Sequence, residues 1–326
     1  MWFKNIEVQR LTYILLMMAV VVITGDLQAQ QAPMFTHYGN SHTAVNPGSY
    51  GLGEGVSVNS IYRDQYTGFN DYATGERVSP RTFLISADLP LPAIAGGVGL
   101  SIMKDKIGLE DNTGVNLGYS YHLDLGAGTL GLGLALNFTN RTVNFSMAVP
   151  IEEGDPSIPS GEQSDMMIDG NIGVFYQIPD QFYAGLSVTS LLESKGKALT
   201  SNATSSASFI GDRTLYLVAG YELNLTNSLL MLNPEVCVMS NFASTQFNIG
   251  AKLWYNEKFY FGTNYRYEES VAVMAGFNIK GLVLSYAYDI STLGLGLKGS
   301  HEVALNYCFK INLNKSPRIY RSARYL

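Results

Sequence analysis

The sequence has few charged residues, two cysteines and no excess of basic residues, and each of these shortages limits what the protein can be. Only 15% of its 326 residues are charged. An average soluble domain has roughly 25%, so we expect a medium other than water to meet part of the surface. The formal net charge of -6 argues against a general nucleic-acid binder, because phosphate contacts require a basic face. Cys237 and Cys308 lie in separate strand-like runs and are expected to be free thiols.

Long apolar runs are also scarce, and the one that stands out is at the N-terminus. Residues 11–25, "LTYILLMMAVVVITG", follow Lys4 and Arg10 and precede the small residue Ala29. The run is shorter than the roughly 20 residues that span a bilayer as a helix. It therefore predicts a secretory signal peptide over residues 1–29, with an uncleaved membrane anchor as the alternative.

The sequence has instead a succession of strand-like segments, together with 33 glycines and 21 tyrosines. Most segments are about 10 residues long, the length that a tilted strand needs to cross a bilayer. The segments, about 14 in number, lie near residues 55–66, 80–90, 95–104, 113–122, 129–145, 166–177, 181–190, 213–223, 229–239, 245–255, 258–268, 271–279, 281–290 and 301–312. The sequence thus predicts an all-β fold, a transmembrane antiparallel up-and-down β-barrel of about 14 strands over residues 55–313, whose last strand pairs with its first.

Charged residues within these strands keep to one face. In residues 299–313, "GSHEVALNYCFKINL", apolar residues such as Val303 and Leu305 alternate with small, polar or charged ones. One face is expected to meet lipid and the other the lumen, since a cation on the lipid face near the midplane would cost roughly 2 to 4 kcal/mol. The predicted lumenal charges are Arg63, Arg266, Asp289, Glu302 and Lys310. We expect them to neutralise one another, and favour a salt-bridged plug over a selectivity role for Arg63 and Arg266.

The connections between the predicted strands are sorted by length. Outer-membrane barrels have short periplasmic turns and longer external loops. With the mature N-terminus in the periplasm, the external loops would be residues 67–79, 147–165, 191–212 and 291–300, and the periplasmic turns residues 123–128, 178–181, 224–227, 255–258 and 279–281. A soluble sandwich has no reason for this sorting, so the sequence predicts a multi-pass barrel in the outer membrane.

Two further segments flank the predicted barrel. Residues 30–54 are predicted to form an N-terminal periplasmic or plug-like segment, and residues 314–326 a periplasmic C-terminal tail. The tail contains four cations and no acid, and could dock on an acidic partner. The docking candidates are Lys315, Arg318, Arg321 and Arg324.

Signals of catalysis or cofactor binding are weak. The histidines His37, His42, His122 and His301 show no metal-site spacing, and no Gly-x-Ser-x-Gly elbow or paired-carboxylate site stands out. The glycine runs "GAGTLGLGLAL" and "STLGLGLKGS" are interpreted as glycine in tightly coiled strands, because no helix follows them to bind a phosphate. We therefore expect no enzyme activity, no metal and no cofactor.

The sequence resembles the PorP/SprF family of outer-membrane proteins of the type IX secretion system, found in gliding and protein-secreting Bacteroidetes. The resemblance covers nearly all of the mature chain, and its most specific part is "LSYAYDISTLGLGLKGSHEVALNY". Other matching segments are "QAPMFTHYGNSHTAVNPGSYG", "YRDQYTGF", "SPRTFLISADLPL", "GVGLSIMKDKIG", "DGNIGVFYQIPDQFYAGLSVTSLL", "AGYELNL", "NPEVCV" and "NYRYEES". Tyr66 departs from the family, which often has tryptophan at this position. The residues around Thr36, His37 and Tyr38 also differ from the usual pattern of the family.

The resemblance implies a non-enzymatic barrel that supports secretion or cell-surface anchoring of cargo proteins, such as adhesins, that carry a type IX C-terminal signal domain. The implied partners are outer-membrane lipid, this cargo and periplasmic secretion-ring or peptidoglycan-associated components. A barrel of about 14 strands is too narrow for a folded adhesin, which favours an anchor or accessory over the export pore. Two alternatives are an outer-membrane channel or transporter for small or hydrophobic solutes, and an outer-membrane hydrolase, whose required Ser/His pair the sequence does not display.

Overall fold

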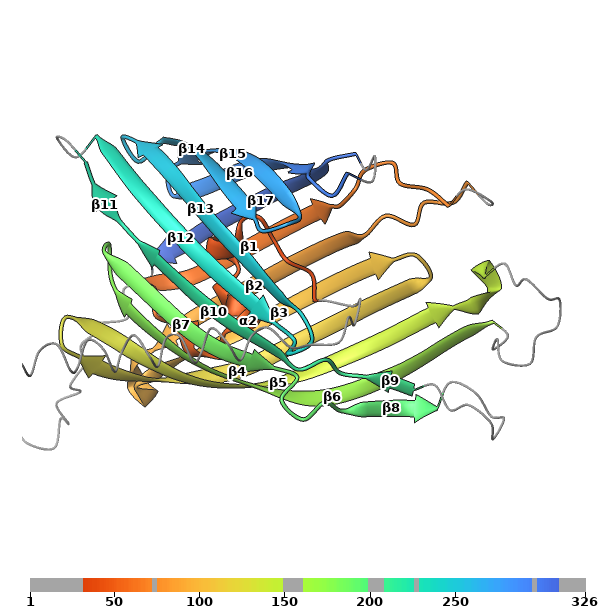
Figure 1. Cartoon of the computed structure of the whole chain (residues 1–326). Coiled ribbons are helices and arrows are strands. Elements are labelled where there is room, and N and C mark those ends of the chain that lie inside the picture. The colour runs from red at the N-terminus through yellow and green to blue at the C-terminus, as the bar shows by residue number, and fades with distance from the viewer. Residues whose placement is uncertain are drawn as a thin grey trace, which may run out of the picture.

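A closed antiparallel barrel makes up most of the structure, a computed structural model that describes residues 32–71, 75–148, 161–198, 208–225, 229–294 and 298–310 (Figure 1). Fourteen strands follow one another around the ring in chain order. They are β1 (Gly55–Asp64), β2 (Arg81–Leu91), β3 (Gly96–Ile107), β4 (Glu110–Leu125), β5 (Gly128–Asn144), β6 (Glu162–Ile178), β7 (Phe182–Thr189), β10 (Thr214–Tyr221), β12 (Leu230–Ser240), β13 (Thr245–Tyr255), β14 (Phe259–Arg266), β15 (Ser270–Ile279), β16 (Leu282–Ser291) and β17 (Ser300–Lys310). The predicted fold class and strand number are confirmed.

The ring closes where the first strand meets the last. β1 pairs antiparallel with β17 from Gly55 opposite Lys310 to Asp64 opposite His301, as predicted. Every other strand of the ring pairs with its sequence neighbour in the ring, including β10 with β12. Closure supplies the backbone hydrogen bonds that an open edge in hydrocarbon would lack.

The remaining elements are short. A hairpin of β8 (Lys195–Ala198) and β9 (Ser208–Ile210) lies outside the ring sheet, and β11 (Leu223–Asn224) pairs with β12 alone. The helical turns are η1 (Tyr38–Asn40), α2 (His42–Val45), η2 (Pro47–Ser49), η3 (Pro92–Ile94) and η4 (Phe145–Met147). Over the described ranges, these helices all fall short of the length and apolarity needed to cross a membrane.

The outer face of the barrel is apolar around its middle. On β5, Leu132, Leu134 and Leu136 point outward and are exposed, Leu134 by 68%. The residues between them, Gly133 and Ala135, are buried on the inner face. This inverted arrangement, with large apolar side chains outside, is the one that a lipid environment stabilises.

One sector of the barrel is taller than the rest. β4, β5 and β6 have 16, 17 and 17 residues, whereas β7, β10 and β14 have 8 each. The additional length of these strands has a polar outer face. β4 begins at Glu110 and β6 at Glu162, a few residues before the predicted starts, because the first residues of both strands are polar and give no apolar alternation. We call these strand ends, together with hairpin β8–β9, the extension (Figure 1).

The extension has a small core of its own. Val143, Met167 and Phe209 are buried against one another there, and Arg141 lies 5.4 Å from the centre of the Phe209 ring. Because Phe209 belongs to β9 and the other two to β5 and β6, this core fixes the hairpin against the tall sector. The extension is therefore a packed structure at the end of the barrel where the long loops lie.

Residues 32–52 lie inside the barrel, and we call them the plug (Figure 1). Hydrogen bonds tie the plug to strands on several sides of the wall. Thr43 donates to Asp88 of β2, Ser120 of β4 donates to the Gly48 carbonyl, and Ser187 of β7 donates to the carbonyl of Val45. Polar side chains on the inner face of the barrel thus hold the plug and pair with carbonyl groups of its backbone.

Candidate functional site

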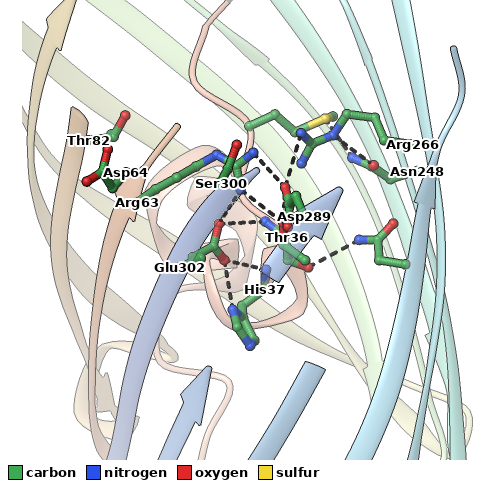
Figure 2. Close-up of polar contacts among 12 residues, drawn as sticks. Thr36, His37, Arg63, Asp64, Thr82, Asn248, Arg266, Asp289, Ser300 and Glu302 are labelled. Atoms are coloured by element: carbon green, nitrogen blue, oxygen red, sulfur yellow. Dashed lines mark hydrogen bonds and ion pairs between the residues drawn. The ribbon is translucent and has the colours of Figure 1, made fainter. Parts of the chain in front are cut away.

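A cluster of charged side chains joins the first part of the plug to one side of the wall (Figure 2). Its wall residues lie at the ends of β1, β14, β16 and β17 that carry the loops. Figure 2 shows that these side chains converge from strands distant in sequence, β1, β14, β16 and β17, on the plug. Its six members, which we call the plug lock, are Thr36, His37, Arg63, Arg266, Asp289 and Glu302.

Arg63 is the cation at the centre of the plug lock, and its side chain is only 2% exposed. Its Nη2 donates to Asp289 Oδ2 at 2.7 Å and its Nη1 to Glu302 Oε2 at 2.9 Å. Nη1 also donates to Thr36 Oγ1 at 3.0 Å. Since the planar guanidinium bridges two carboxylates and a plug hydroxyl, it joins β1, β16 and β17 to the plug by charge-assisted hydrogen bonds.

Glu302 binds the plug backbone directly. Its carboxylate accepts hydrogen bonds from the backbone N–H groups of Thr36 at 2.8 Å and His37 at 2.7 Å, and Nδ1 of His37 lies 2.8 Å from Oε1. With Arg63, this gives a fully buried carboxylate four polar contacts. Such a group is stable in a buried site only because its charge and its lone pairs are both satisfied.

Asp289 and Arg266 extend the plug lock along the wall. Thr36 Oγ1 donates to Asp289 at 2.8 Å, while Arg266 lies 3.7 Å from the same carboxylate. Arg266 also donates to Asn248 at 3.2 Å and pairs with Glu269 at 2.7 Å. Arg266 is therefore held by Asn248 of the neighbouring strand β13 and by Glu269, which follows β14, and it contributes to the plug lock mainly through electrostatics.

The structure brings together four of the five charges that the sequence placed in the lumen. Arg63, Arg266, Asp289 and Glu302 are buried on the inner face, and their mutual neutralisation is visible in the ion pairs above. Lys310 differs, because its side chain is 80% exposed and pairs with Glu54. It has inward parity, but β17 ends there, at the rim of the barrel.

Other expected site residues lie elsewhere or were missed. The tail candidates Lys315, Arg318, Arg321 and Arg324, and the signal peptide over residues 1–29, fall outside the described residues. Thr36 and His37 were not recognised as partners of the charges because the plug has no periodic pattern. The charges gave no signal for them either, because by strand parity the inner faces of β1, β16 and β17 have two carboxylates, Asp289 and Glu302, and two cations, Arg63 and Lys310.

The charged groups of the plug lock are paired with one another and with donors of the plug. In the part of the chain that the structure describes, no group of three or more His, Cys, Asp or Glu side chains could hold a metal ion. Within the plug lock, each carboxylate is already occupied by Arg63 and by plug donors. The arrangement can therefore hold residues 36 and 37 in place with high specificity, which is what such a buried network does best.

Comparison with solved structures finds several similar chains, and the three given below have TM-scores under 0.5. The toluene transporter TbuX of Ralstonia pickettii has a TM-score of 0.49 and 16% identity, over 83% of this chain and 94% of that one. A FadL homologue of Pseudomonas aeruginosa has a TM-score of 0.48 and 10% identity, over 83% and 94% of the two chains. Omp33 of Acinetobacter baumannii has a TM-score of 0.43 and 8% identity, over 79% and 100%.

The family is established by the sequence rather than by these structures. No curated protein matches the chain. A family model, described as type IX secretion system membrane protein PorP/SprF, matches residues 27–307 and so covers the plug and nearly all of the barrel. The chain is a multi-pass barrel of the outer membrane, and it belongs to the PorP/SprF family of type IX secretion system membrane proteins.

Proposed function

We propose that this barrel is a non-enzymatic accessory of type IX secretion that supports secretion or surface anchoring of cargo proteins, such as adhesins, with a C-terminal signal domain. The observation that carries the proposal is the plug, fastened inside the barrel by the buried plug lock. A barrel of fourteen strands is narrower than the 16- to 18-stranded porins that leave an aqueous channel, and here the plug occupies part of its interior. A folded cargo has no path through it, which favours an anchor over an export pore.

The cargo-facing surface in this proposal is the extension with the loops around it, residues 146–165 and 191–212. Two observations support this choice. The extension is polar outside and has its own core of Val143, Met167 and Phe209, so it is rigid enough to present a binding surface beyond the membrane. It also lies at the end with the longer loops, which in outer-membrane barrels is the external end.

Contacts with the periplasmic machinery belong to the opposite end. β17 reaches that end at Lys310, and residues 314–326 come shortly after it in the sequence. We assign to their four cations, Lys315, Arg318, Arg321 and Arg324, a role in docking on acidic secretion-ring or peptidoglycan-associated components. Truncation after Asn314 should weaken recovery of those components, and equal recovery with and without the tail would contradict this role.

The proposal is tested by mass spectrometry of the proteins that co-purify with the tagged barrel from native outer membranes in mild detergent. Wild type should recover a large secreted protein with a C-terminal signal domain. Replacing residues 146–165 and 191–212 with short Gly/Ser turns should abolish this recovery but leave barrel assembly intact. The matched control replaces residues 241–244, a short loop at the same end, and should retain the cargo.

Two results would contradict the anchor. One is unchanged cargo recovery after both replacements. The other is recovery of the barrel alone from wild-type membranes, together with measurable conductance in planar bilayers. That second result would support instead the channel for small or hydrophobic solutes.

A further inference from the structure

A cavity of about 390 Å³ opens between the plug and the turn-end halves of the strands. Its lining comes from β1, β2, β6, β7, β12, β13, β14, β16 and β17, at positions near the ends that carry the tight turns. It lies on the side of the plug opposite to the plug lock, whose wall residues come from the loop ends of β1, β16 and β17. Its size is in the range of small-ligand sites, and it is large enough for one or two long side chains.

Carboxylates outnumber cations in this cavity. Asp88, Glu222 and Glu235 line it, against a single ammonium, that of Lys252. Lys252 Nζ lies 2.6 Å from Glu235 Oε1, in a pair with side chains 9% and 10% exposed. Asp88 accepts a hydrogen bond from the backbone N–H of Gly51. Within the described part of the chain Glu222 forms no ion pair, so the cavity has excess negative charge.

Aromatic rings form a second part of the lining. The rings of Phe175 and Tyr183 are stacked with centroids 5.7 Å apart, and His42 lies 4.8 Å from Tyr183. On the other side, Trp254 and Tyr260 lie 4.7 Å apart. Faces of Trp, Tyr and Phe rings attract ammonium and guanidinium groups, most strongly where water is excluded.

Several polar atoms at the cavity are buried without a hydrogen-bond partner among the described residues. They are both ring nitrogens of His42, the hydroxyl oxygen of Tyr183 and Oδ1 of Asn233. Buried polar groups of native proteins are nearly always paired with protein, water or ligand atoms, so unpaired groups that share one cavity suit a polar occupant. Asn233 Oδ1 is an acceptor and Tyr183 can accept as well, which suits a ligand with several N–H donors.

We propose that this cavity binds a basic peptide segment, with a lysine or arginine side chain placed between Glu222 and the aromatic rings. The excess carboxylate supplies the charge, the rings supply a face for the alkyl chain and cation, and the unpaired acceptors receive its N–H groups. The segment reaches the cavity from the turn end. This site is independent of the cargo surface, which lies at the other end of the barrel.

A basic segment could come from a partner protein or from the chain's own residues 314–326. The tail has four cations and no acid, and β17 ends at the same end of the barrel. Truncation after Asn314 separates these sources. If the tail is the resident ligand, the truncated chain should bind an added basic peptide more tightly than the full chain does. Equal affinity indicates that a partner supplies the segment.

The test measures fluorescence anisotropy of a labelled Gly-Arg-Arg-Arg-Gly peptide with the purified full-length barrel in neutral detergent. The Arg peptide should bind, and peptides with Gln or Glu in place of Arg should not. Glu222→Gln should weaken binding by at least about fivefold. Asp124→Asn removes one negative charge at an exposed position at the same end that does not line the cavity, and should change the affinity by less than about twofold.

Each variant is first checked for an intact barrel by its heat-modifiable mobility in gels. Equal binding of the Arg and Gln peptides by the wild-type chain and by the chain truncated after Asn314 would overturn the proposal, and so would equal losses in Glu222→Gln and Asp124→Asn. The first result would show that charge does not select the ligand. The second would show that the peptide senses the whole rim and not this cavity.

Discussion

Gly133 on the inner wall of the barrel lies directly against Pro47 of the plug, so closely that a Cβ atom at Gly133 would overlap the Pro47 carbonyl carbon. The neighbouring wall residues Gly131 and Gly173 are in the same position, since Cβ atoms there would overlap Gly48 and Asn46. Glycines of β5 and β6 thus leave room for the backbone of the plug. The lack of a side chain at these positions is a requirement of the filled interior.

Gly133→Ala should therefore destabilise the protein. Overpacking at a tight contact costs about 1 to 3 kcal/mol, because the plug or the strand must shift. The measurement is the free energy of unfolding from denaturant titration of the protein in detergent micelles. Gly170→Ala on β6 is the matched control, since a Cβ atom there meets nothing within 4 Å. Equal effects of the two substitutions would show that close approach of the plug is not the constraint.

The glycines also show where sequence reasoning ends. Alternation of glycine with leucine in residues 131–136 correctly indicated a strand with one lipid-facing side, because that signal is local. The reason for the glycines was not the predicted coiling of the strand but the plug, which comes from residues 46–48. A contact between segments so far apart leaves no periodic trace in a single sequence. The barrel could thus be predicted from period and length, and the packing of its interior could not.

Arg63→Met tests the energetic role of the plug lock. The substitution leaves Asp289 and Glu302 buried without their shared cation, and loss of one partner from a buried ion pair costs about 3 to 5 kcal/mol. Denaturant titration should show this loss. Lys310→Met removes an ion pair with Glu54 that is exposed on both sides, and should leave the stability unchanged. A similar stability for both variants would mean that the buried pairs contribute no more than the exposed one.

Glu302→Ala should release the plug, and the native Cys237 thiol can report this. Cys237 is buried on the wall beside Tyr38 of the plug. Glu302 accepts three hydrogen bonds from Thr36 and His37, each worth about 1.5 kcal/mol or more to a charged acceptor. In a Cys308→Ser background, maleimide labelling of Cys237 should therefore accelerate at least about tenfold.

The control for this experiment is Glu54→Ala in the same background. Glu54 precedes β1 and pairs only with the exposed Lys310 among the described residues, so its loss should leave the labelling rate of Cys237 unchanged. An unchanged rate in Glu302→Ala, with an intact barrel, would show that the plug stays in place without Glu302. Acceleration in both variants would point to general loosening of the barrel.

The wall residues of the plug lock could be predicted from the sequence, whereas its plug residues could not. Strand parity placed Arg63, Asp289 and Glu302 on the inner face, since lipid excludes charge from the other face. Parity does not show where along a strand the enclosed interior ends, and Lys310, at the last position of β17, is exposed at the rim. The plug partners Thr36 and His37 lie in irregular backbone, whose course depends on the tertiary fold.

The outer face of β5 should mark the boundary of the membrane. Leu134 and Thr142 have the same outward parity on this strand, but Leu134 lies in the apolar stretch and Thr142 in the polar part that belongs to the extension. Leu134→Arg should destabilise the barrel in lipid vesicles by roughly 2 to 4 kcal/mol, because the cation must be held near the middle of the bilayer. Thr142→Arg should cost at most about 1 kcal/mol, because its side chain would stand in water or at the interface. Equal costs would place both residues at one depth, and the extension would then lie within the membrane and not beyond it.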